Sequence, residues 1–137
     1  MTSFESPVKT IPASVETVFE TLSDLSNLEK VRDRLPEDKI EKFYCDRDNC
    51  RFIVNPMGQI AMRIVEREPV KTIKFESVES PVPFSAWIQL LPTPESNTAI
   101  KLTIHAELNP FIKGLVSKPM QDAVNKLAET IALIPFD

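Results

Sequence analysis

Apolar side chains change their spacing twice along this chain, and the changes divide it into three parts. From Ser14 to Leu22 they recur at helical spacing, and a second short helical segment follows over residues 26–35 until Pro36 ends it. From Asp38 to Leu108 apolar residues recur at every second position, which is typical of strands. Helical spacing returns after Asn109. This order predicts two short helices, a sheet and a long closing helix.

Turn residues separate the middle part into six short segments. We expect strands over residues 40–45, 50–55, 60–65, 72–76, 84–91 and 100–108. The sequence Asp46-Arg-Asp-Asn49 favours a tight turn between the first two, because Asp and Asn side chains bond to nearby backbone groups. Since the connections are short, consecutive strands should be antiparallel neighbours. An additional edge-like strand is expected over residues 3–11.

The last part should be one helix over residues 110–134. Asn109 is a suitable N-cap, Pro110 suits the first helical turn, and Pro119 should kink the helix. Its apolar stripe is expected to lie on the sheet and comprises Ile112, Leu115, Val116, Ala123, Leu127, Ile131 and Ile134.

This organisation resembles the helix-grip fold of the SRPBCC, or START-like, superfamily, which includes plant pollen allergens, lipid-transfer domains and polyketide cyclases. The resemblance covers essentially the whole chain and is carried by 15–28 with its segment Asp24-Leu-Ser-Asn-Leu28, Ile73-Lys-Phe75, Trp87-Ile-Gln-Leu90 and the helix from Asn109. It implies an α+β fold in which a curved antiparallel sheet of about seven strands wraps around a long C-terminal helix, with two short helices after the first strand. It also implies a cavity between sheet and helix for apolar or amphipathic small molecules.

Composition excludes several classes of function. A chain of 137 residues is expected to form a single domain over 1–137. A net charge of −4 with scattered Lys and Arg argues against a nucleic-acid partner. No apolar run approaches the ~20 residues of a membrane span, and no basic leader precedes an apolar run, so we expect no span and a cytoplasmic location. The sequence does not distinguish a monomer from a weak dimer.

Residues suited to catalysis or metal binding are few. His105 is the single histidine and falls on the polar face of its strand, so we expect it at the surface. Together with Cys45 and Cys50 it offers too few ligands for zinc. We interpret the two cysteines as reduced structural thiols, although the turn between them could place them across a hairpin. No catalytic residue, metal or cofactor is predicted.

Trp87 and Gln89 share one face of a strand whose other face carries Phe84. Both faces are partly apolar, so the pattern leaves their orientation open. Inward orientation would give a cavity an aromatic wall and one neutral hydrogen-bonding group. The candidate ligand-binding residues are Trp87, Gln89, Phe52, Met57, Met62, Phe75, Phe84, Phe111 and Leu115.

The favoured function is therefore binding of a hydrophobic or amphipathic small molecule between the sheet and the C-terminal helix, without catalysis. One alternative is a cyclase or dehydratase type of enzyme acting on a bound polyketide-like or aromatic substrate, which requires an ionisable group in the cavity. A second alternative is a structural or protein-interaction module with a filled core. The volume and lining of the space beneath residues 110–134 distinguish these three hypotheses.

Overall fold

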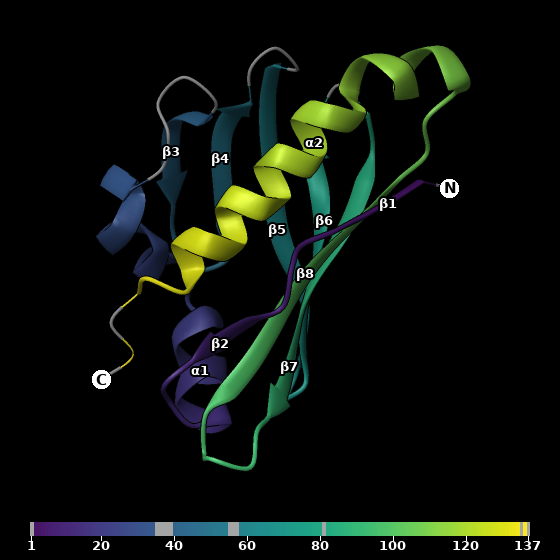
Figure 1. The fold of residues 1–137 in the computed structure, drawn as a ribbon. Helices are drawn as coiled ribbons and strands as arrows, with labels where there is room; N and C mark the ends of the chain where they lie inside the picture. The colour runs from purple at the N-terminus through teal and green to yellow at the C-terminus, as the bar shows by residue number, and fades with distance from the viewer. Residues whose placement is uncertain (1, 35–39, 55–57, 81, 135, 137) are drawn as a thin grey trace.

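The computed structural model describes residues 2–34, 40–54, 58–80, 82–134 and 136. Its described part contains an eight-stranded antiparallel sheet with a long helix lying across one face, as Figure 1 shows. The strands are β1 (Thr2–Glu5), β2 (Lys9–Ile11), β3 (Ile40–Cys45), β4 (Asn49–Val54), β5 (Gly58–Glu68), β6 (Thr72–Glu79), β7 (Phe84–Pro92) and β8 (Thr98–Ala106). Their order is β1-β8-β7-β6-β5-β4-β3, and β2 also pairs with β8. This arrangement confirms the helix-grip fold and the six strands expected between residues 38 and 108.

The segment expected as one first strand forms two strands, β1 and β2, which both pair with β8. Pro7 lies between them and has no N–H to contribute. The side chain of Ser6 compensates, because its Oγ accepts a hydrogen bond from the N–H of Leu102 at 2.9 Å. The Ser6 N–H donates to the Leu102 carbonyl at 2.9 Å. The edge of the sheet therefore stays attached across the break.

Side chains cap both α-helices at their N-termini, and the cap expected at Asn109 is confirmed. Helix α1 (Val15–Leu22) begins after Ser14, whose hydroxyl accepts from the N–H of Thr17. Helix α2 (Pro110–Ile131) begins after Asn109, whose Oδ1 accepts from the N–H of Ile112 at 2.8 Å. The second short helix is a 3₁₀ helix, η1 (Leu25–Arg34). In the described part of the chain, no helix has the length and apolar character needed to cross a membrane.

The buried side of α2 differs from the expected stripe. Its buried residues begin only at Met120 and are Met120, Ala123, Val124, Ala128, Thr130 and Ile131. Leu115 is 60% exposed, so the expectation that it packs on the sheet is wrong. Leu115 and Ala123 belong to one row of side chains, but Pro119 lies between them. The first turns of α2 run in a different direction from the rest of the helix in Figure 1, as a proline inside a helix causes.

An irregularity in β3 changes which of its side chains face the core. Lys42 has a φ of 52°, and the register with β4 shifts between Glu41 and Tyr44. Ile40, Phe43 and Cys45 are buried as a result. Strict alternation from Ile40 would instead have buried Lys42 and Tyr44.

Cys45 and Cys50 form a disulfide, so the interpretation of two reduced thiols is wrong. The antiparallel register of β3 and β4 places the two residues directly opposite each other, with their Cα atoms 4.2 Å apart. Strand pairing alone therefore brings the two sulfur atoms within bonding reach. Both residues are buried.

Candidate functional site

A cavity of about 70 Å³ lies between the inner face of the sheet and the three helical segments. Strands β3 to β8 form its wall, Leu22, Leu25 and Leu28 reach it from α1 and η1, and α2 covers it with Met120, Ala123, Leu127 and Ile131. Large apolar side chains dominate the wall: Phe43, Phe52, Phe75, Phe84 and Met62.

The chemistry of the cavity is almost entirely apolar. Ser80 and Thr103 are the only polar residues in its described lining, which contains no Asp, Glu, His, Lys or Arg. Acid–base catalysis requires an ionisable group within hydrogen-bond reach of the substrate. A charged ligand group would also lose its hydration here without gaining a partner. The described lining thus suits a neutral apolar group.

The volume is intermediate between a filled core and an open ligand site. It exceeds the ~10–15 Å³ that one water molecule needs, but it lies below the ~300 Å³ of ordinary small-molecule sites. Phe43 and Phe52 pack together with their ring centroids 5.6 Å apart. Met62 and Met120 have flexible side chains that can adopt other rotamers as a ligand enters.

Five of the candidate residues line this cavity: Phe52, Met62, Phe75, Phe84 and Trp87. Phe111 and Leu115 do not, being 76% and 60% exposed on the first turns of α2. Met57 lies outside the described residues.

Trp87 and Gln89 lie on the outer face of the sheet. Trp87 pairs with Thr103 on β8, and its ring packs edge-on against His105 with a centroid distance of 4.6 Å. Trp87 also borders the cavity. Because side chains alternate along β7, it does so with its main chain, and its indole points to the outer face. Gln89 is exposed. The expectation that His105 faces outward agrees with its position, although its ring is half-buried against Trp87.

Sequence reasoning missed Phe43 and the three leucines of α1 and η1. Phe43 was overlooked because the bulge at Lys42 reverses the strand alternation. The burial of Phe43 could have been predicted from the spacing of the apolar residues Ile40, Phe43 and Cys45. This spacing fits one face of a strand only if one extra residue is inserted between the first two. The leucines follow ordinary helical spacing, which indicates burial but does not indicate a cavity.

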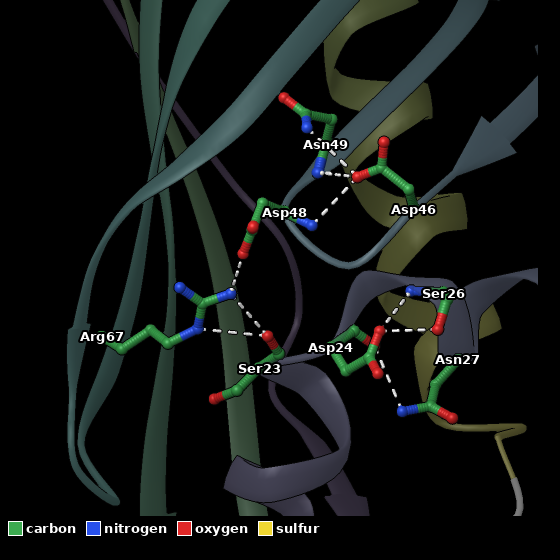
Figure 2. A network of polar contacts seen from close by, with 8 residues as sticks. All are labelled: Ser23, Asp24, Ser26, Asn27, Asp46, Asp48, Asn49 and Arg67. Carbon is green, nitrogen blue, oxygen red and sulfur yellow. Dashed lines mark hydrogen bonds and ion pairs between the residues drawn. The ribbon is translucent and has the colours of Figure 1, made fainter.

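A network of polar contacts fixes the helical side of the cavity (Figure 2). Arg67 of β5 donates from Nε and Nη2 to the carbonyl of Ser23 at 3.1 and 2.7 Å, and Nη2 also contacts Asp48 at 2.5 Å. The N–H of Leu25 donates to the carbonyl of Arg47 at 2.9 Å. The end of α1, the β3–β4 turn and β5 are thereby joined directly beside Leu22 and Leu25.

Two carboxylates of this region are stabilised in their charged form. The Ser26 hydroxyl donates to Asp24 and holds the pKa of that carboxyl below its ordinary value of 3.8. The Asn49 side chain does the same for the pKa of Asp46. Because both pKa values are lowered in the native state, this stabilisation is present at neutral pH and is lost as the pH falls through them. Within the described residues, no three His, Cys, Asp or Glu side chains are grouped as metal ligands.

The sequence also matches a known family over residues 1–132, one described as polyketide cyclase / dehydrase and lipid transport. The chain belongs to this family. No curated protein matches the chain.

Solved structures share the fold across nearly all of the chain. A protein from Thermus thermophilus has a TM-score of 0.66 at 22% identity, covering 96% of this chain and 94% of that one. Norcoclaurine synthase from Thalictrum flavum, in complex with dopamine and hydroxybenzaldehyde, has a TM-score of 0.70 at 16% identity, covering 96% and 84%. A START superfamily protein from Mycobacterium smegmatis has a TM-score of 0.55 at 13% identity, covering 91% and 98%. These similarities show that the protein has the helix-grip fold.

Proposed function

We propose that the protein binds a neutral, mainly apolar small molecule in the cavity beneath α2. The observation that carries this proposal is the cavity lining, in which no described residue is ionisable. Burial of apolar surface supplies the affinity, and the four phenylalanine rings favour a ligand with a flat or aromatic part. An amphipathic ligand would keep its polar group outside this lining, where water can hydrate it.

Binding without catalysis fits the lining better than a cyclase or dehydratase activity does. The family description covers both enzymes and lipid transport, and norcoclaurine synthase is a solved neighbour with two small aromatic molecules bound. An enzyme of this type needs a group that can move a proton or stabilise charge beside the substrate. The described lining offers only Ser80 for such a role, because the side chain of Thr103 lies on the outer face of the sheet beside Trp87.

A pair of substitutions on α2 tests the proposal. Ala123 lines the cavity, whereas Ala128 is fully buried and does not line it. We expect Ala123→Leu to fill empty space and change the free energy of unfolding by less than about 1 kcal/mol. Ala128→Leu should cost about 1–3 kcal/mol, because no space receives the added atoms.

Ligand binding should separate the same two variants. Titration with an environment-sensitive apolar dye, and native mass spectrometry of the purified protein, should show saturable binding by the unmodified chain and by Ala128→Leu but not by Ala123→Leu. Salt should have little effect on the affinity, because apolar contacts dominate it. Equal dye binding by Ala123→Leu would place the dye elsewhere and contradict the proposal.

A further inference from the structure

The outer face of the sheet, opposite the cavity, carries a shallow groove of about 410 Å³. It lies over β5, β6 and β7, and Trp87 forms part of it. Lys74 and Thr103 stand beside Trp87 on the neighbouring strands, and the next outward positions along β7 are Ser85 and Gln89. Glu76 pairs with Ser85. We call these six residues the Trp87 platform.

The indole of this platform is held in place before any ligand arrives. His105 packs edge-on against it, and Thr103 beside it is 4% exposed. An aromatic ring gives up little conformational freedom on binding when its neighbours already fix it. Because Trp87 is half-buried, part of its surface stays open to a ligand.

The polar groups around the ring are available for new hydrogen bonds. Among the described residues, the side chains of Glu76, Ser85 and Gln89 form no hydrogen bond within the protein. Together they offer a carboxylate acceptor, a hydroxyl and an amide that both donates and accepts. A ligand with several adjacent hydroxyl groups matches this mixed set, since each hydroxyl is both donor and acceptor.

The charges on this face favour a neutral ligand. Lys74 forms an ion pair with Glu66 at 3.2 Å, and Lys101 forms one with Glu5. With both lysines paired, the groove retains Glu68 and Glu76, which disfavour an anion. A cation would be attracted, but the platform has a single large aromatic ring where a cation-binding cage needs several.

From these observations we infer that the Trp87 platform is a binding site for a neutral saccharide. The C–H groups on one face of a pyranose ring would pack on the indole, whose face carries negative charge density. Its hydroxyls would exchange hydrogen bonds with Gln89, Ser85 and Glu76. This site is separate from the apolar cavity and does not depend on the proposed function of that cavity.

Intrinsic fluorescence tests the inference, because Trp87 is the only tryptophan in the sequence. The probes are cellohexaose, xylohexaose, maltohexaose, mannohexaose and chitohexaose, each titrated to about 10 mM, where weak sites with Kd near 1 mM saturate. At least one should shift the emission saturably, with little dependence on salt. The Ala123→Leu variant, whose cavity is filled, should bind it equally well.

Matched variants locate the binding site. Gln89→Ala should weaken binding about threefold to tenfold, whereas Gln59→Ala, an exposed glutamine on β5, should leave it unchanged. Trp87→Ala, followed by saturation-transfer NMR and checked for folding by circular dichroism, should abolish binding. A lack of saturation by all five probes would overturn the inference. So would binding that survives Trp87→Ala, that is lost in Ala123→Leu, or that disappears at high salt.

Discussion

Leu90 and Leu91 are adjacent on β7 and have opposite surroundings. Leu90 is 6% exposed on the inner face, and Leu91 is 67% exposed on the outer face. Leu90→Ala should therefore lower the free energy of unfolding by about 2–5 kcal/mol. Leu91→Ala should change it by less than about 0.5 kcal/mol. Urea denaturation of both variants measures the difference, and similar losses at the two positions would contradict the orientation of β7.

Orientation in this part of the sheet was only partly predictable from single residues. On β8 the alternation of Ile100 and Leu102 with Lys101 identifies the inner face without ambiguity. On β7 both faces are partly apolar, and only the pairing with β8 assigns Trp87 to the outer face. Phe43 could not be placed by alternation at all, because the positive φ of Lys42 is a property of the folded backbone.

At the scale of secondary-structure elements, Arg67 connects three segments that are distant in sequence. Its guanidinium donates to the carbonyl at the end of α1 and contacts Asp48 in the β3–β4 turn (Figure 2). Lysine cannot reproduce this forked geometry, so Arg67→Lys should cost about 1–2 kcal/mol.

The Arg67→Lys substitution should loosen the structure around this residue as well as lower the free energy of unfolding. Hydrogen exchange should become faster at the backbone of residues 22–28, where α1 meets η1. The control is Arg63→Lys, an exposed arginine on the same strand, which should change stability by less than about 0.5 kcal/mol. Unchanged exchange in residues 22–28 of the Arg67 variant would show that packing alone holds this helical segment.

The elements themselves were predictable because their signals are local. Side chains at Ser14 and Asn109 cap the helices, and Asp46 accepts from the backbone and side chain of Asn49 to close the turn. The burial of α2 was less predictable. Helical spacing assigns Leu115 and Ala123 to one face, but the change of helix direction at Pro119 separates their environments.

For the molecule as a whole, the sequence indicated a space beneath α2 but not its size. Apolar residues that line a cavity have the same periodicity as those that fill a core. Which of the two occurs depends on how completely side chains from distant strands and helices interlock, a property of the packed structure. The absence of charged residues from the described lining was easier to predict, because the inward positions on β5, β6 and β8 are apolar in the sequence itself.

The disulfide affects both the stability of the molecule and the wall of its cavity. Cys45 and Cys50 lie two residues from Phe43 and Phe52, which pack together in the cavity lining. For so short a loop the chain-entropy account gives a stabilisation of about 2 kcal/mol. Dithiothreitol should lower the free energy of unfolding by about this amount and weaken apolar dye binding, because the Phe43–Phe52 pair loses its covalent neighbour.

The Cys45→Ala/Cys50→Ala double variant is the control and should not respond to dithiothreitol. Thiol titration of the denatured, unreduced protein should detect no free thiol, since both cysteines of the sequence are in the disulfide. The same titration on protein trapped with an alkylating reagent inside cells bears on location, because disulfides are rare in the reducing cytosol. Two alkylated cysteines in a chain that binds the dye equally well with and without dithiothreitol would show that the disulfide is dispensable for the cavity. An intact disulfide in cells would instead argue against the cytoplasmic location expected from the sequence.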